Sequence, residues 1–153
     1  MLTVLVPGSA ELVLEHLVLD LNGTLSERGQ LIEGVADRLR RLGADLDIWV
    51  VTADTLGTAR ALVADLPIKL ETISRGDDKS AFVRGLGSNC TAAIGNGRND
   101  EAMLREAALA IAVIGPEGAA GQTLTVADIV CRSILEALDL LLDTRLLVAT
   151  LRP

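Results

Sequence analysis

Residues 16–25 read HLVLDLNGTL, a short apolar run that ends at Asp20 and is followed by a turn sequence. The run at 17–19 has no polar alternation, which favours a strand buried on both faces of a parallel sheet. The pair Asn22-Gly23 is also the commonest two-residue hairpin signal, so a plain turn is the alternative interpretation. Ligands of open parallel sheets bind outside the carboxyl ends of the strands, which makes Asp20 a candidate site residue.

Outward from this segment, apolar runs alternate with stretches of helical periodicity. Such alternation is typical of βαβ units and a mainly parallel sheet covered on both faces. We therefore expect an α/β fold, a three-layer α/β/α Rossmann-like arrangement. The predicted strands are 16–19, 46–51, 68–73, 91–94, 109–114 and 128–130, and the predicted helices are 33–42, 54–66, 77–86, 99–107, 119–124 and 133–142.

The N-terminal residues predict a β-hairpin that precedes the parallel strands. An apolar run at 2–6 ends at the turn sequence Pro7-Gly8-Ser9, and residues 11–15 alternate between polar and apolar. At the other end of the chain, residues 140–142 and 146–151 are rich in leucine. We expect these leucines either to join the core or to form a subunit interface of a homo-oligomer.

Composition limits the classes of function. The 153 residues fit one domain over 1–153, and a hydrophobic share of 50% is ample for a core. Aromatic residues make up only 1% and the net charge is −7, so stacking on nucleic-acid bases and attraction to a phosphate backbone are both disfavoured. The most apolar region, 134–151, contains four charged residues, so we expect no membrane partner.

The cysteines indicate a reducing compartment. Cys90 and Cys131 lie far apart in the sequence and form no CxxC motif or Cys/His cluster, so we expect buried thiols. The N-terminus lacks a basic segment followed by a long apolar one, so we expect a cytoplasmic protein. His16 begins the strand that ends at Asp20, and we expect it to have a packing role.

Polar residues follow the predicted strands at one edge of the sheet and suit phosphoryl transfer. An aspartate such as Asp20 can attack phosphorus, and a lysine such as Lys79 can neutralise charge on the transferring group. Thr52 and Lys79 are predicted to hold phosphate. The cofactor that fits is Mg²⁺, which prefers oxygen ligands. The predicted ligands are Asp20, Asp100, the side chain of Asn96 and the backbone carbonyl of Asn22, and the further predicted substrate contacts are Thr24, Ala53 and Asn99.

Four segments in order resemble the motifs of the haloacid dehalogenase (HAD) superfamily. The sequence DLNGTL at 20–25 is similar to its first motif, DxDGTL, and Val51-Thr52 and Lys79 fit its second and third. The sequence GNGRND at 95–100 resembles the GDGxND form of P-type ATPases. The resemblance implies a Mg²⁺-dependent phosphatase that forms an aspartyl-phosphate, similar to small soluble P-type ATPase-like members. Its substrate would be a phosphorylated small molecule or an exposed phosphoryl group.

The motif spacing implies a member without a cap domain. The gaps between the first and second motifs and between the second and third are each about 26 residues, too few for an inserted cap. Such members are implied to act on large or exposed substrates, or to use a neighbouring subunit as a lid.

Two departures from the family motifs remove carboxylates. Asn22 stands where the family has the aspartate that protonates the leaving group, and loss of a general acid typically slows a reaction by about 10²–10⁴-fold. Asn96 replaces another aspartate and implies weaker metal binding. P-type ATPases also lack the first of these aspartates. The alternatives are therefore an ATP-hydrolysing domain with a persistent phosphoenzyme, and a pseudoenzyme that acts as a binding or assembly module.

Other interpretations of the same residues are weaker. The Gly95-x-Gly97 pattern could indicate a dinucleotide-binding loop, but Asp100 occupies the third glycine position and would repel a pyrophosphate. Lys79 taken alone would be a solvated helix charge. The loop at 115–118 is expected near the site, without a chemical role.

Overall fold

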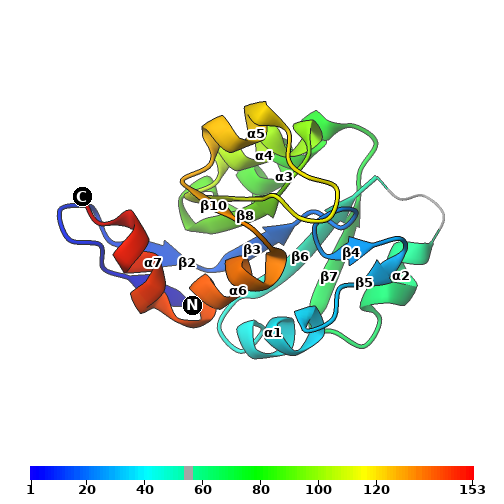
Figure 1. The fold of residues 1–153 in the computed structure, drawn as a ribbon, viewed down its shortest axis with the longest axis horizontal. Helices are drawn as coiled ribbons and strands as arrows, with labels where there is room; N and C mark the ends of the chain where they lie inside the picture. The colour runs from blue at the N-terminus through cyan, green and yellow to red at the C-terminus, as the bar shows by residue number, and fades with distance from the viewer. Residues whose placement is uncertain (54–56) are drawn as a thin grey trace.

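The computed structural model describes residues 1–53 and 57–153 and shows a six-stranded parallel sheet with helices on both faces (Figure 1). The strand order is β10-β9-β8-β3-β6-β7, so the expected three-layer α/β/α architecture is confirmed. The sheet strands are β3 (His16–Leu19), β6 (Asp47–Thr52), β7 (Ile68–Thr72), β8 (Thr91–Gly95), β9 (Leu109–Val113) and β10 (Ile129–Cys131).

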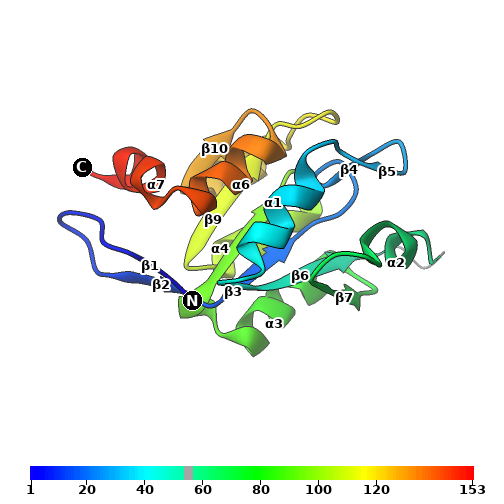
Figure 2. The same ribbon diagram turned by 90° about the horizontal axis from the view of Figure 1, so that it is seen from below.

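The helices divide into two groups that cover opposite faces of the sheet (Figures 1 and 2). Helices α1 and α6 contact each other on one face, and α3, α4 and α5 cover the other. The guanidinium of Arg38 on α1 donates two hydrogen bonds, of 2.7 and 2.9 Å, to the carboxylate of Asp139 on α6. The helices are α1 (Val35–Leu42), α2 (Thr58–Val63), α3 (Gly76–Leu86), α4 (Glu101–Glu106), α5 (Gly121–Val126), α6 (Ile134–Leu142) and α7 (Thr144–Leu151), with 3₁₀ turns η1 (Ser88–Cys90) and η2 (Arg98–Asp100).

The predicted N-terminal hairpin is confirmed. Strand β1 (Leu2–Val4) pairs antiparallel with β2 (Leu12–Leu14), and the C-terminal helix α7 lies beside them (Figure 1). Leu147 of α7 is fully buried in the same cluster as Leu14. The leucine-rich C-terminus therefore contributes to the core of this chain, although Leu146 remains 49% exposed.

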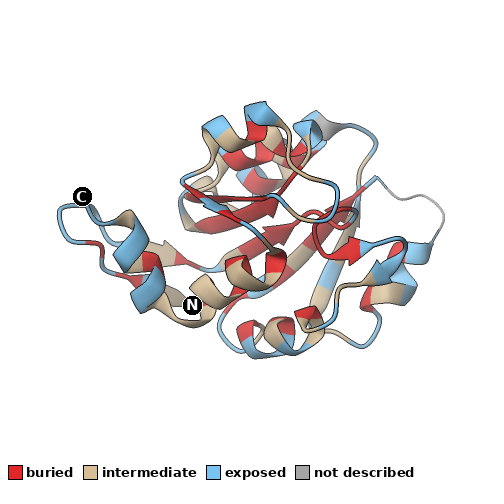
Figure 3. Cartoon of the chain, viewed as in Figure 1, coloured by how far each residue is buried: buried red, intermediate tan, exposed pale blue. Residues whose placement is uncertain are grey.

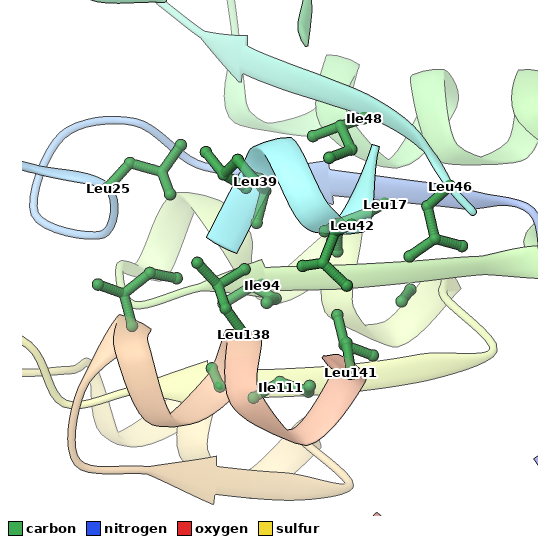
Figure 4. Packing of buried hydrophobic residues seen from close by; sticks show 14 of the residues in the cluster. Leu17, Leu25, Leu39, Leu42, Leu46, Ile48, Ile94, Ile111, Leu138 and Leu141 are labelled. Atoms are coloured by element: carbon green, nitrogen blue, oxygen red, sulfur yellow. The ribbon is translucent and has the colours of Figure 1, made fainter. Parts of the chain in front are cut away.

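The central strands β3, β8 and β9 are buried on both faces, as the red centre of the sheet in Figure 3 shows, whereas no residue of the edge strand β7 is fully buried. Leu17 and Leu19 of β3 pack into the cluster that includes α1 and α6, which Figure 4 shows from close by. Val18 points to the opposite face, where β8 and β9 present alanines. Because side chains alternate across a strand, continuous apolar runs supply both layers at once. The alanines on the second face are Ala93, Ala110 and Ala112.

Helix boundaries differ from the sequence-based expectation by one or two residues in most helices and by more in α2. The helix expected over 54–66 is α2, which begins only at Thr58 because Gly57 has a left-handed φ of 76°; residues 54–56 lie outside the described part of the chain. Helix α3 begins at Gly76, and the carboxylate of Asp78 caps it by accepting hydrogen bonds from the backbone N–H groups of Ser74 and Arg75.

Between β3 and α1 the chain forms only a small hairpin, β4 (Ser26–Glu27) with β5 (Gln30–Leu31). This segment is far too short to be a cap domain. Across the described ranges, no helix has both the length and the apolarity needed to cross a bilayer.

Replacing Leu138 with alanine tests the core between α6 and the sheet. Leu138 is fully buried, so we expect Leu138→Ala to lower the free energy of unfolding by about 2–5 kcal/mol. Leu146→Ala removes the same atoms from an exposed position and is expected to change it by less than about 0.5 kcal/mol. Urea denaturation of both variants measures the difference, and equal losses would contradict the packing described here.

Candidate active site

The candidate site lies at the carboxyl edge of the sheet, at the point where the order in which strands are added to the sheet reverses. From β3 the chain proceeds outward to β6 and β7, and it then returns to build β8, β9 and β10 on the other side. Asp20 directly follows β3, and Asn96 directly follows the adjacent β8. Such a switch point leaves a crevice at the strand ends, the usual ligand-binding position in open α/β sheets.

A buried ion triad occupies the floor of this crevice. The ammonium nitrogen of Lys79, on α3, lies 2.7 Å from Asp20 Oδ1 and 2.6 Å from Asp100 Oδ1. Lys79 is 1% exposed, so its charge is held away from water by these two partners. Two carboxylates around one ammonium leave one excess negative charge, which suits the binding of a further cation.

Burial and charge shift the pKa values of this triad. Burial, together with the negative charge of Asp100, raises the pKa of Asp20 to about 6 against the opposing effect of Lys79 and Thr24. For Lys79, burial lowers the pKa, but the charges and hydrogen bonds of Asp20 and Asp100 outweigh it, so the net pKa is raised. Lys79 therefore stays protonated next to Asp20, whose pKa is raised. Such shifted pKa values are frequent in active sites.

Asp100 holds the loop after β8 in place. Its Oδ2 accepts hydrogen bonds from the backbone N–H groups of Asn96 at 3.0 Å and Gly97 at 2.9 Å, while its Oδ1 accepts from Lys79. A Cβ at position 95 would lie 2.6 Å from Asp100 Cγ, so only glycine allows the carboxylate to approach this closely. The spacing of these residues therefore follows from the close approach of Asp100 to Gly95 and from the hydrogen bond that the Gly97 N–H donates to Asp100.

Thr24 connects the two strand ends behind the pocket. Its fully buried hydroxyl lies 3.1 Å from Asp20 Oδ2 and 3.2 Å from Asn96 Oδ1. The Leu21 carbonyl accepts hydrogen bonds from the N–H groups of Leu25 and Ser26, which closes the turn that contains Asn22 and Gly23. The turn interpretation of these residues and the site interpretation are therefore compatible, because the turn itself positions Thr24.

A pocket of about 500 Å³ opens above Asp20. Six predicted site residues line it, but Thr24, Lys79 and Asp100 lie behind its wall and are at most 1% exposed. The structure thus separates a group that faces the pocket from a group that positions Asp20 from below. The lining residues are Asp20, Asn22, Thr52, Ala53, Thr58, Asn96, Gly97, Asn99 and Glu117.

Glu117 was missed by sequence reasoning, which assigned no chemistry to its loop. Among the described residues that line the pocket, Asp20 and Glu117 are the carboxylates. The Glu117 Cδ lies 2.8 Å from the point where a Cβ on Gly23 would sit, and Asn96 Nδ2 lies 3.1 Å from that point. Asn96 Nδ2 also donates a 3.0 Å hydrogen bond to the carbonyl of Gly118. No sequence motif identifies Glu117, because it lies in the loop after β9 and only the position of that strand in the sheet brings it to the site.

Comparison with solved structures shows that this fold is similar to that of proteins described as HAD hydrolases. It resembles 3-deoxy-D-manno-octulosonate 8-phosphate phosphatase from Moraxella catarrhalis, solved with magnesium, phosphate and KDO, at a TM-score of 0.67 and 22% identity over 91% of this chain and 94% of that one. The cobalt-bound octulosonate 8-phosphate phosphatase from Haemophilus influenzae has a TM-score of 0.70 and 18% identity, covering 86% of this chain and 89% of that one. The chain has the fold of a cap-less HAD protein.

Two further matches cover less of the partner protein. A zinc-transporting PIB-type ATPase matches 78% of this chain and 20% of its own length, at a TM-score of 0.65 and 24% identity. An uncharacterised protein from Methanocaldococcus jannaschii, MJ0073, is 55% identical over 60 residues, which are 39% of this chain and 64% of that protein, slightly less than two thirds. No family model matches the sequence.

Removing the ammonium from the ion triad should destabilise the protein. Lys79→Met leaves two buried carboxylates without their partner, and breaking a buried pair in this way typically costs about 3–5 kcal/mol. The sequence has one other lysine, Lys69, whose side chain is 54% exposed beside Asp47, so Lys69→Met is expected to cost about 1 kcal/mol or less. Chemical denaturation at neutral pH measures both, and a small loss for Lys79→Met would show that the triad is not buried.

Proposed function

We propose that this protein is a Mg²⁺-dependent phosphatase that transfers the phosphoryl group to Asp20. The observation that carries the proposal is the contact of one buried ammonium, Lys79, with both Asp20 and Asp100 at the switch point of a HAD fold. A carboxylate at the floor of a pocket, with a fixed cation beneath it, can serve as a nucleophile towards phosphorus while the cation offsets negative charge.

The reaction proceeds in two displacement steps. The Asp20 carboxylate forms a bond to phosphorus as the bond to the leaving oxygen breaks, and the leaving group then takes a proton from solvent, because an Asn22 amide cannot supply one. Water next attacks the aspartyl-phosphate, releasing inorganic phosphate and regenerating the carboxylate. Thr52 at the pocket wall holds a phosphoryl oxygen, and Ala53 and Asn99 contribute to the same wall.

The pocket residues fit a magnesium ion. Asp20, the Asn96 side-chain oxygen and the Asn22 backbone carbonyl are hard oxygen donors of the kind Mg²⁺ prefers. Asp100 is fully buried and does not line the pocket, so it contributes mainly through Lys79 and the loop that it holds. When bound, Mg²⁺ would offset charge on the transferring phosphoryl group.

Glu117 supplies part of the negative charge that Asn22 and Asn96 lack. With Asp20 and Asp100 balanced in part by Lys79, the floor of the site carries one net negative charge. The carboxylate of Glu117 adds a second beside Asn96, which matches the charge of one divalent cation. Glu117 therefore takes part in holding the metal, directly or through water.

Neutralising Glu117 should weaken metal binding. We expect Glu117→Gln to raise the Kd for Mg²⁺ by about tenfold, because a carboxylate ligand or its close partner is lost. Glu101→Gln changes a carboxylate on the adjacent helix that does not line this pocket and should leave the Kd unchanged. Calorimetric titration with Mg²⁺ measures the affinity without any substrate, and an unchanged Kd for Glu117→Gln would refute this role.

Asn22 determines which substrates react well. Without a proton donor for the leaving group, nitrophenyl phosphate or an acyl phosphate should react far faster than an alkyl phosphate. We expect Asn22→Asp to accelerate alkyl phosphate hydrolysis by about 10²-fold or more, since a general acid is restored. Steady-state rates on both substrates test this, and a rate on alkyl phosphates that is unaffected by Asn22→Asp would contradict it.

The whole proposal is tested by a phosphatase screen over phosphorylated metabolites with Mg²⁺. Asp20→Asn, which keeps the size of the side chain but removes the nucleophile, should abolish hydrolysis, as should removal of the metal with EDTA. Proteins of similar fold include 3-deoxy-D-manno-octulosonate 8-phosphate phosphatases, and the pocket is open to solvent, so the screen includes phosphorylated metabolites and exposed phosphoryl groups on larger molecules. Phosphatase activity that persists in Asp20→Asn would contradict the proposal.

A second candidate is an ATP-hydrolysing domain with a persistent phosphoenzyme. The fold similarity to a PIB-type ATPase and the amide at position 22 both favour it. Labelled phosphate trapped on Asp20 from ATP would support this alternative. Mg²⁺-dependent binding of beryllium fluoride without turnover of any substrate would instead indicate a binding module.

A further inference from the structure

The opposite edge of the sheet holds a second cluster of metal-ligand side chains. One ligand atom from each of Glu15, His16 and Cys90 lies within 4.8 Å of the other two. The expectation of a buried thiol is wrong for Cys90, which is only half-buried. Cys90 lies 74 positions from His16 in the sequence but beside it in the fold. The cluster lies at the amino-terminal end of β3, whereas Asp20 follows its carboxyl end.

The backbone fixes the three residues relative to one another. The Glu15 N–H donates a 2.8 Å hydrogen bond to the Cys90 carbonyl, and the Glu15 carbonyl accepts a 2.9 Å bond from the Asp47 N–H. His16 pairs in register with Thr91, the residue after Cys90, and with Asp47 on the other side. The ligands are thus carried on adjacent strand ends, which is a rigid arrangement compared with a surface loop.

The histidine provides an independent sign of a missing partner. Among the described residues, His16 Nδ1 is one of two buried side-chain nitrogen or oxygen atoms without a hydrogen-bond partner. Its neighbouring carboxylate oxygen, Asp47 Oδ2, lies 3.9 Å away, too far for a hydrogen bond. Buried polar atoms are seldom left unsatisfied in folded proteins, and a bound ion can supply the partner that such an atom lacks.

We propose that Glu15, His16 and Cys90 form a binding site for a zinc ion. A thiolate, an imidazole and a carboxylate are typical zinc ligands, whereas magnesium takes oxygen donors. One thiolate and one carboxylate balance the charge of the ion, and the partial exposure of the cluster leaves a fourth position for water. Tetrahedral bonds of about 2.0–2.3 Å place ligand atoms about 3.3–3.8 Å apart, so the side chains close by roughly 1 Å on binding.

Binding requires only local changes. The Cys90 thiol now donates to the Gly87 carbonyl at 3.4 Å, and zinc binding replaces its proton, which passes to solvent. Of the three ligand residues, Glu15 lines a hollow of about 310 Å³ that opens to solvent.

Cobalt titration of the full-length chain tests the site. Because Co²⁺ bound to a thiolate absorbs strongly in the near ultraviolet, one equivalent at pH 7.5 should produce this charge-transfer band, and Zn²⁺ should displace it. Cobalt at the Asp20 site meets only oxygen donors and gives no such band, so the signal reports on this cluster alone. Cys90→Ser should abolish the band, whereas Cys131→Ala and Asp20→Asn should retain it.

Exposed Glu15 gives a second variant that does not threaten folding. Glu15→Gln should weaken zinc binding by about tenfold or more in calorimetry, with an unchanged melting temperature in the absence of metal. The proposal is overturned if the wild-type chain gives no charge-transfer band, or if the band survives Cys90→Ser. Equal zinc affinity of the wild type and Glu15→Gln would remove Glu15 from the ligand set.

Discussion

The ammonium of Lys79, placed between Asp20 and Asp100, is the interaction on which the rest of the site depends. It joins a helix to the ends of two adjacent strands, and all three side chains are almost completely buried. Burying three charges carries a large desolvation cost that a well-packed apolar core would avoid. Such an arrangement is therefore better explained by the need for an oriented carboxylate at the pocket floor than by stability.

The geometry of the site persists although two expected carboxylates are amides. The loop after β8 is held by backbone N–H groups that donate to Asp100 and by the absence of a Cβ at Gly95, and neither depends on the charge at position 96. Asn96 still presents an oxygen to Thr24 and an amide nitrogen to the Gly118 carbonyl. The loop geometry is thus independent of whether position 96 carries a charge.

Side chains that can bind a metal ion lie near both ends of the central strand β3. Its carboxyl end presents hard oxygen donors, and its amino end presents a thiol, an imidazole and a carboxylate. These donor sets differ in softness, so they favour different divalent ions. The residues of β3 between the two ends, 17–19, are apolar and buried, so the two sites are coupled only through a rigid element.

The sequence by itself determined the layers, the alternation of strands and helices, and most of the site. Continuous apolar runs indicate buried parallel strands, and the polar residues that follow them, such as Asp20 and Asn96, necessarily gather at one edge. It could not place Glu117 or bring Cys90 to His16, since neither has a local pattern. Only the tertiary structure decided these contacts, because they arise from strand pairing between distant segments. Which side chains face the pocket and which lie behind it is likewise set by packing that no local periodicity encodes.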